Sequence, residues 1–206
     1  MTDLKQTLAE LAARHIAEEG LSYGQAKRKA AKQAGVSEAS AAMPDNAAIE
    51  ATLRAYLNEF QSDTQPQELR RLRTLALRWV AALQALRELD TPCQVLAVGA
   101  VVNGCANEHS AVHLQVFTDE DKFLEMGLLN AGIETTPSEQ KMDGKLRPVL
   151  VANDAGTPIV MTLFPQAAYA APKILLAGIT PQWATQAQLE ELLNEPVLGS
   201  ADRALS

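Results

Sequence analysis

Residues 95–117 read VLAVGAVVNGCANEHSAVHLQVF, and this stretch carries most of the information about the fold. Its two ends, within 94–98 and 111–117, are rich in apolar and β-branched residues, whereas glycine and small or polar residues fill the middle. Apolar runs bounded by turn-forming residues are typical of strands. The stretch therefore predicts two strands joined by a loop, with Gly99 directly after the first strand and Gly104 inside the connection.

The segment before this stretch predicts helices. Apolar residues recur at helical spacing from Leu4 to Ile16, from Ile49 to Phe60 and from Leu69 to Leu86. Ser22 is a suitable N-cap for a further helix, which Gly35 ends. The N-terminal part of the chain should therefore be a helical region.

The segment after it mixes both kinds of element. Helical spacing returns over 119–131, with an apolar stripe of Phe123, Met126 and Leu128 or Leu129, and again over 181–194.

Two further strands are expected between these helices, at 146–152 and 158–164. The turn at 153–156 reads Asn-Asp-Ala-Gly, which is typical of a β-hairpin. The order of the elements predicts the α+β class, in which a helical N-terminal region precedes a mixed β-sheet with flanking helices. The polar break at 61–65 divides the chain into a helical region at 1–60, a domain at 66–195 and a tail at 196–206.

The composition is that of a globular protein. Of 206 residues, 47% are hydrophobic and 21% are charged, which excludes disorder over most of the length. Cys93 and Cys105 form neither a C-x-x-C pair nor a disulfide framework, so a reducing, cytoplasmic location is expected. The best apolar run, 95–102, is much shorter than the ~18 residues of a membrane-spanning helix, so no membrane segment is expected.

The stretch 95–117 is similar to the signature of the polymerase-β-like nucleotidyltransferase superfamily. In that signature a strand ends in Gly-Ser, about ten residues with a further glycine follow, and the next strand reads Ser-Asp-apolar-Asp-Leu. The spacing matches here without a gap, and the signature positions that this chain retains or nearly retains are Gly99, Ala100, Gly104, Ser110, Val112 and Leu114. The resemblance implies a nucleotidyltransferase-like mixed sheet.

The carboxylates that such an enzyme needs are missing. In the family, two acids at i and i+2 on one strand, and a third from a neighbouring strand, hold the metal ions that neutralise the triphosphate. Ala111 and His113 occupy the first two positions, and the matching neighbour, 158–164, contains no acid. The resemblance thus implies a degenerate member, a pseudoenzyme in which Mg²⁺ binding and catalytic residues are not expected. The ligand-binding candidates are Gly99, Ala100, Gly104, Ser110 and His113.

The whole chain also resembles an uncharacterised bacterial family whose members are labelled nucleotidyltransferase-like or UDP-N-acetylmuramate–alanine ligase. The similar segments are EEGLSYGQAKRKAA at 18–31, MPDNAAIEATLRAYLNEF at 43–60 and HSAVHLQVF at 109–117. The ligase label finds no support, because the chain has no G-x-x-G-K-[ST] phosphate loop and is too short for three domains.

Two other residue sets suggest different chemistry. Cys105, His109 and His113 are residue types that bind zinc. Because His113 is expected on a strand and His109 in the turn before it, their regular spacing is no evidence that they share a site. A basic cluster gives the stretch 21–37 a charge of +4 and could meet a phosphate backbone, although a solvated helix face is the ordinary explanation. The cluster consists of Lys27, Arg28, Lys29 and Lys32 beside Tyr23, and a second basic set is Arg70, Arg71, Arg73 and Arg78.

Three functions are therefore compatible with the sequence. The first is a non-enzymatic binding or regulatory protein that takes a nucleotide-like ligand or a protein partner. The second is a nucleotidyltransferase with altered metal chemistry, and the third is an interaction module of the toxin-antitoxin or RNA-binding type. The sequence leaves the ligand, the cofactor and the oligomeric state open.

Overall fold

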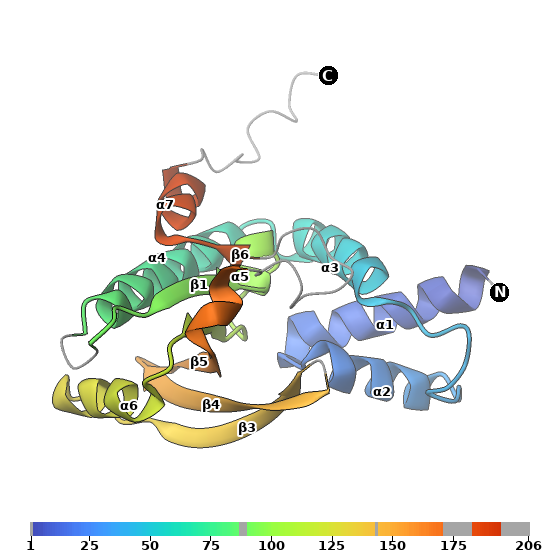
Figure 1. The fold of residues 1–206 in the computed structure, drawn as a ribbon. Helices are drawn as coiled ribbons and strands as arrows, with labels where there is room; N and C mark the ends of the chain where they lie inside the picture. The colour runs from blue at the N-terminus through green and yellow to red at the C-terminus, as the bar shows by residue number, and fades with distance from the viewer. Residues whose placement is uncertain (1, 87–89, 143, 171–182, 195–206) are drawn as a thin grey trace. The chain divides into compact units, whose positions relative to one another are not determined.

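The computed structural model of the chain describes residues 2–86, 90–142, 144–170 and 183–194 (Figure 1). They divide into two compact units, named here the helical unit and the sheet unit. The described parts of the helical unit are 2–69 and 104–109, and those of the sheet unit lie within 70–103 and 110–196.

The boundaries expected from the sequence, 1–60 and 66–195, differ from this division in detail. The boundary in the sequence falls between Leu69 and Arg70, and the short segment 104–109 belongs to the helical unit. The expected tail, 196–206, lies outside the described residues. The domain assignment therefore stays a prediction.

The predicted α+β class is confirmed, because the described residues contain seven α-helices and one mixed sheet of six strands. The first four helices are α1 (Thr2–Glu19), α2 (Tyr23–Gln33), α3 (Asn46–Phe60) and α4 (Gln65–Gln84). None of the helices in the described part of the chain is long and apolar enough to cross a membrane.

Local sequence explains where α2 and α3 begin. The Ser22 hydroxyl accepts a hydrogen bond from the backbone N–H of Gln25, whose side chain in turn binds the Ser22 N–H, so a full capping box starts α2. The Asp45 carboxylate accepts from Ala48 N–H at 2.8 Å and caps α3. The Ser22 cap agrees with the sequence prediction.

Alanine makes close packing possible in the helical unit. Ala12 and Ala13 of α1 and Ala26 and Ala30 of α2 are fully buried, and α1 and α2 lie side by side (Figure 1). Leucine and isoleucine side chains from α1 and α3 complete the same core.

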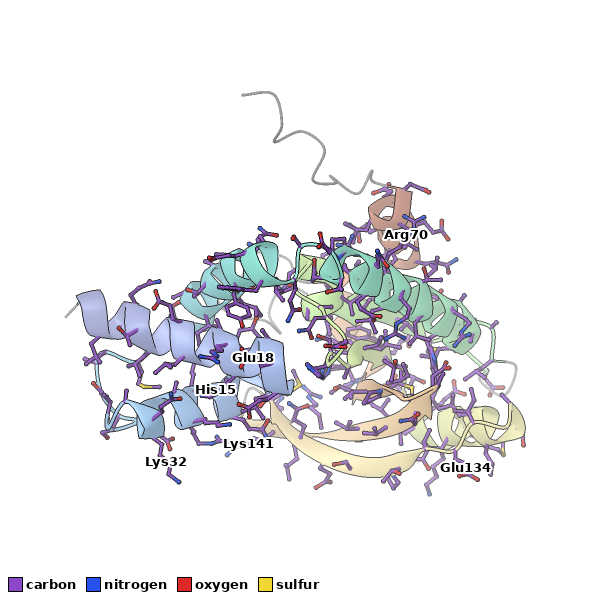
Figure 2. All side chains as sticks on the ribbon, turned by 180° about the vertical axis from the view of Figure 1, so that it is seen from behind. His15, Glu18, Lys32, Arg70, Glu134 and Lys141 are labelled. Carbon is purple, nitrogen blue, oxygen red and sulfur yellow. The ribbon has the colours of Figure 1, made fainter. Side chains whose placement is uncertain are left out.

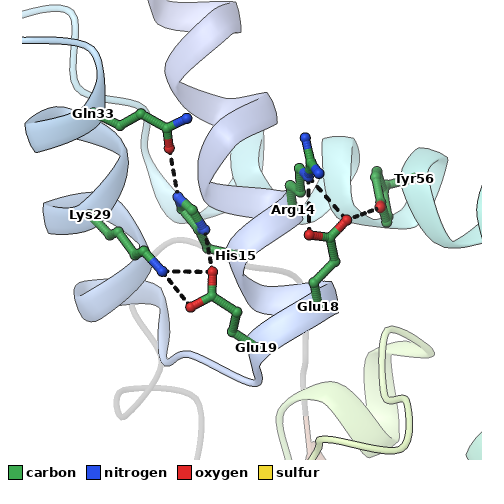
Figure 3. Close-up of polar contacts among 7 residues, drawn as sticks. All are labelled: Arg14, His15, Glu18, Glu19, Lys29, Gln33 and Tyr56. Carbon is green, nitrogen blue, oxygen red and sulfur yellow. Dashed lines mark hydrogen bonds and ion pairs between the residues drawn. The ribbon is translucent and has the colours of Figure 1, made fainter.

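Polar side chains on α1 bind the neighbouring helix α2 (Figures 2 and 3). His15 contacts Glu19 through Nδ1 at 2.8 Å and Gln33 through Nε2 at 3.0 Å, and Lys29 donates to the same Glu19 carboxylate. The hydrogen bonds from Lys29 and His15 lower the pKa of Glu19. Two residues of α1 are thereby tied to two residues of α2.

A second polar link joins α1 to α3 (Figure 3). The Tyr56 hydroxyl donates to Glu18 at 2.7 Å, and Arg14 donates to the same carboxylate at 3.0 Å. The Tyr56 hydrogen bond, followed by the Arg14 hydrogen bond, lowers the pKa of Glu18.

The sheet unit is built on strands of both directions. Its strands are β1 (Gln94–Val98), β2 (Val112–Phe117), β3 (Thr136–Met142), β4 (Lys145–Asp154), β5 (Thr157–Phe164) and β6 (Trp183–Ala184). Its short helices are α5 (Ala100–Asn103), α6 (Asp121–Asn130), the 3₁₀ helix η1 (Gln166–Ala170) and α7 (Gln186–Asn194). The strand order is β3-β4-β5-β2-β1-β6, and β3 and β4 form a long hairpin (Figure 1).

The central strand β2 pairs with β1 in the antiparallel sense and with β5 in the parallel sense. One face of these strands is fully buried at Ala97, Leu114 and Met161. On the other face, the rings of Phe117 and Phe164 stack with centroids 5.4 Å apart. The sheet therefore has apolar packing on both faces.

Two strands were missed and one predicted helix was too long. The segment at β3 shows no apolar alternation, because nearly all its side chains are exposed and its pairing with β4 comes from the hairpin. The helix predicted over 181–194 begins only at Gln186, since Trp183 and Ala184 pair with β1 as β6. Residues 181 and 182 lie outside the described residues.

Gly20 and Gly35 offer a matched test of packing in the helical unit, because both have a φ of +67°. A Cβ on Gly20 would lie 2.9 Å from His109 Cβ, whereas a Cβ on Gly35 would meet no described atom within 4 Å. Gly35→Ala should cost about 1–2 kcal/mol for the left-handed backbone alone. Gly20→Ala should cost about 1–3 kcal/mol more, because segment 104–109 must shift.

Urea unfolding of the two variants and the wild type measures this difference. Equal losses for both glycines would contradict the contact between Gly20 and His109.

Candidate functional site

One row of side chains crosses the four inner strands β1, β2, β5 and β4 at the end where β1 stops and β2 starts, and Trp183 of β6 and Thr136 of β3 pair with its outer members. Val98 of β1 lies opposite His113 of β2, which lies opposite Val160 of β5, and Val160 lies opposite Val151 of β4. Directly paired residues point to the same face, so these four share one face. His113 is exposed and the three valines are half-buried. We call them the edge row.

On β1, β2, β5 and β4 the edge row is the accessible part of its face. Two residues further from this end of each strand, the next row is buried on the same four strands, and its members are Leu96, Gln115, Thr162 and Val149. Ser138 of β3, which lies opposite Val149, is exposed. A ligand could therefore reach the edge row but not the row behind it.

Gly99 turns the chain out of β1 beside the edge row. Its φ is +73°, and its carbonyl oxygen accepts from the N–H groups of Val102 and Asn103, which starts α5 at Ala100. No described atom outside its chain neighbours lies within 4 Å of the place that a Cβ would take. Glycine is thus required here by the backbone angle, and the space beside it is open.

The structure brings only some of the predicted pocket residues together. Gly99, Ala100, Ser110 and His113 lie within or next to the paired ends of β1 and β2 in the sheet unit. Gly104 belongs to the helical unit and is described with that unit alone. A pocket that includes all five residues stays a prediction.

His113 is the titratable group of the edge row. Its side chain is accessible to solvent, yet desolvation lowers its pKa, so we expect a neutral imidazole at pH 7. Its strand neighbours in the row, Val98 and Val160, contribute only apolar surface.

The weak metal candidates Cys105 and His109 lie in the helical unit. Cys105 is buried, and burial raises the pKa of its thiol to about 11, so it carries a proton at neutral pH. His109 lies 3.7 Å from the carboxylate of its neighbour Glu108. Among the described residues, no three His, Cys, Asp or Glu side chains are grouped so as to hold a metal ion.

Sequence reasoning missed a carboxylate at the same end of the sheet. Asp154, at the end of β4, accepts a hydrogen bond from Trp79 Nε1 at 2.7 Å and another from Arg78. These hydrogen bonds, first that of Trp79, lower the pKa of Asp154. The alternation of side chains along β4 places Asp154 on the opposite face from Val151, and hence from His113.

Asp154 lines an open groove of about 900 Å³. The groove is formed by α4, by the segment after α6 and by the paired ends of β4 and β5. Its lining includes Arg78, Trp79, Glu134, Thr136, Asn153 and Asp154. Since Arg78 and Asp154 bind each other, the groove carries little net charge from this pair.

No protein-family model and no curated protein sequence matches the chain. Among solved structures, the Cid1 poly(U) polymerase is 16% identical, with a TM-score of 0.37 over 52% of this chain and 34% of that chain. A cytoplasmic RNA terminal U-transferase is 17% identical, with a TM-score of 0.41 over 58% and 36%. Cid1 in complex with the UTP analogue UMPNPP is 18% identical, with a TM-score of 0.32 over 64% and 41%.

The chain thus spans roughly a third to two fifths of the length of these proteins. Similarity at this level carries no functional conclusion for the chain.

Asp154→Asn should destabilise the protein at pH 7 by about 1 kcal/mol, because it weakens a charge-assisted hydrogen bond that is partly exposed. The folded-state pKa of Asp154 is lowered. The carboxylate's contribution is therefore complete above the unfolded-state pKa of about 3.9 and is lost as the pH falls through the folded-state pKa.

Urea unfolding of both proteins between neutral pH and roughly pH 3 tests this prediction. Asp63→Asn, which changes an exposed carboxylate in the helical unit, serves as the control and should change little. A difference for Asp154→Asn that does not shrink at low pH would show that the carboxylate's charge is not what stabilises the fold.

Proposed function

We propose that the chain is a nucleotidyltransferase-like protein that binds a nucleotide-like ligand or a protein partner at the edge row without transferring nucleotidyl groups. The observation that carries the proposal is the composition of the edge row and of Ala111, two residues before His113. Where the family signature has two acids, this chain has Ala111 and His113, and the paired strand β5 contains no acid.

For Mg²⁺ binding, the loss of carboxylate charge at positions 111 and 113 matters more than the change in side-chain shape. A two-metal site stabilises an in-line displacement by bridging the triphosphate, and Mg²⁺ binds oxygen ligands, above all carboxylates. A neutral imidazole between Val98 and Val160 is a poor Mg²⁺ ligand. The same surface suits a planar or apolar group, because apolar side chains surround one hydrogen-bonding ring.

A nucleotidyltransferase with altered metal chemistry is the alternative for the same residues. Titration with ATP, CTP, GTP and UTP, with and without Mg²⁺ or Zn²⁺, separates these ideas. Binding that needs no metal supports the proposal, and binding that needs a metal supports the alternative. Absence of binding favours a toxin-antitoxin type of interaction module.

A second candidate function, binding of single-stranded RNA, rests on an observation in the helical unit. An open groove of about 1030 Å³ runs along α2. Its lining includes Leu21, Gln25, Arg28, Lys29, Lys32 and Val36. Arg28 and Lys32 lie one helical turn apart on α2, and Lys32 points away from α1 (Figure 2).

Two features limit this RNA surface. Lys29 already binds Glu19. Tyr23, expected beside the basic cluster, is half-buried, and burial raises the pKa of its hydroxyl. The surface therefore offers phosphate contacts without an aromatic platform for bases.

Purified protein should not transfer nucleotidyl groups from any of the four nucleotides to protein, RNA or a small acceptor. Ala111→Asp combined with His113→Asp should create Mg²⁺ affinity, because it restores the i, i+2 pair on one face, although the third acid is still missing. Isothermal titration with Mg²⁺ measures this gain.

Ala111→Asn combined with His113→Asn is the matched control, since it restores similar shape without charge. Transfer by the wild type that is lost on His113→Ala would overturn the proposal. Equal Mg²⁺ binding by the Asp and Asn double variants would show that the two positions do not share a site.

For the second candidate, a fluorescein-labelled oligouridine should bind weakly, and log K should fall with log salt by about 0.7 for each phosphate contact. Arg28→Gln with Lys32→Gln should reduce that slope by about 1.4, because two contacts are lost. Lys141→Gln with Lys145→Gln removes two exposed cations from the sheet unit and should leave the slope unchanged. If both double variants reduced the slope equally, RNA binding would depend on the net charge of the protein and not on the α2 groove.

A further inference from the structure

The helix α6 exposes the residues that its sequence would lead one to bury. Its buried residues are Leu124, Gly127 and Leu128. Its exposed apolar residues are Phe123, at 50% of its surface, Met126, at 44%, and Leu129, at 66%. In the described part of the chain six large hydrophobic residues are exposed, and these are three of them. An apolar cluster of this kind on a single short helix marks an interaction surface.

The three side chains follow one side of the helix, at intervals of three residues. A groove of about 510 Å³ lies beside them. Its apolar lining is Met126, Leu129 and Ile133, and its polar lining is Lys122, Glu125, Glu134 and Thr135. The surface therefore combines an exposed ring, Phe123, with a groove whose lining is partly apolar and partly charged.

The chain reverses at the end of α6 and returns along it. Gly132, with a φ of +76°, donates to the Leu129 carbonyl, and Ile133 donates to the Leu128 carbonyl, both at 2.9 Å. This capping pattern brings Ile133 and Glu134 back beside the last turn of the helix. Figure 2 shows Glu134 next to α6. One end of the surface thus carries Lys122 and the other Glu134, and both line the same groove.

These features are self-complementary under a two-fold axis near Met126. Antiparallel packing of two α6 helices would place Phe123 of each copy against Leu129 and Ile133 of the other. It would also bring Lys122 of each copy toward Glu134 of the other, because the two charges lie at opposite ends. Such an interface uses the same surface patch on both subunits and closes on itself.

We propose that the exposed face of α6, with residues 133 and 134, is the interface of a symmetric homodimer. The occupant of the apolar surface is a second copy of this chain. The interface lies wholly within the sheet unit and does not depend on the edge row.

Sedimentation equilibrium of the wild type should show a monomer–dimer equilibrium. Met126→Glu should raise the dissociation constant about tenfold or more, because two like charges would meet at the axis. Phe60→Glu is the matched control, since Phe60 is 64% exposed on α3, and it should leave the equilibrium unchanged. A wild type that stays monomeric up to about 200 μM, where even a weak dimer forms, would overturn the proposal.

A charge exchange shows whether the second copy is bound in the proposed orientation. Lys122→Glu and Glu134→Lys should each weaken the dimer, and the two substitutions together should restore it, because every new charge again faces its opposite. Both side chains lie in exposed positions, so circular dichroism should show that the variants remain folded. A dimer that neither single variant weakens, or that the double variant fails to restore, would place the interface elsewhere.

Discussion

The pairing of β2 with β1 on one side and β5 on the other determines where His113 and its two neighbours in the edge row lie. This register places His113 between Val98 and Val160 and leaves Gly99 at the turn beside them. A shift by one residue would exchange the two faces of β2 and send His113 into the buried layer that Leu114 now occupies. The apolar packing on both faces of the sheet opposes such a shift.

The helical unit depends on a different constraint, the small size of its core residues. Alanine lets α1 and α2 approach closely, but each buried alanine contributes little apolar area. The polar link from His15 and Glu19 to Lys29 therefore helps to determine how α1 and α2 pack where small alanine side chains form their contact (Figure 3). Glu19 accepts from both groups and fixes which face of α2 meets α1. Gly20, directly after it, lets the chain turn in close contact with His109.

The sequence was most informative where local chemistry decides structure. Ser22 begins α2, and the apolar run at 94–98 matches β1 to the residue. It was least informative where contacts with a distant segment of the chain determine the local structure. The strand β3 has no apolar pattern and exists because β4 folds against it. Asp154 also escaped notice, because only the fold brings it to Trp79 of α4.

Asp154 is a carboxylate at the same end of the sheet as His113, but it belongs to the other face. Side chains alternate along β4, so Asp154 and Val151 lie on opposite faces, and only the face of Val151 contains His113. The carboxylate is also held by hydrogen bonds from Trp79 and Arg78, which favour its charged form where it stands. A metal ion bound at Asp154 would thus be separated from His113 by the sheet itself. Asp154 and His113 therefore belong to separate sites, one on each face of the sheet.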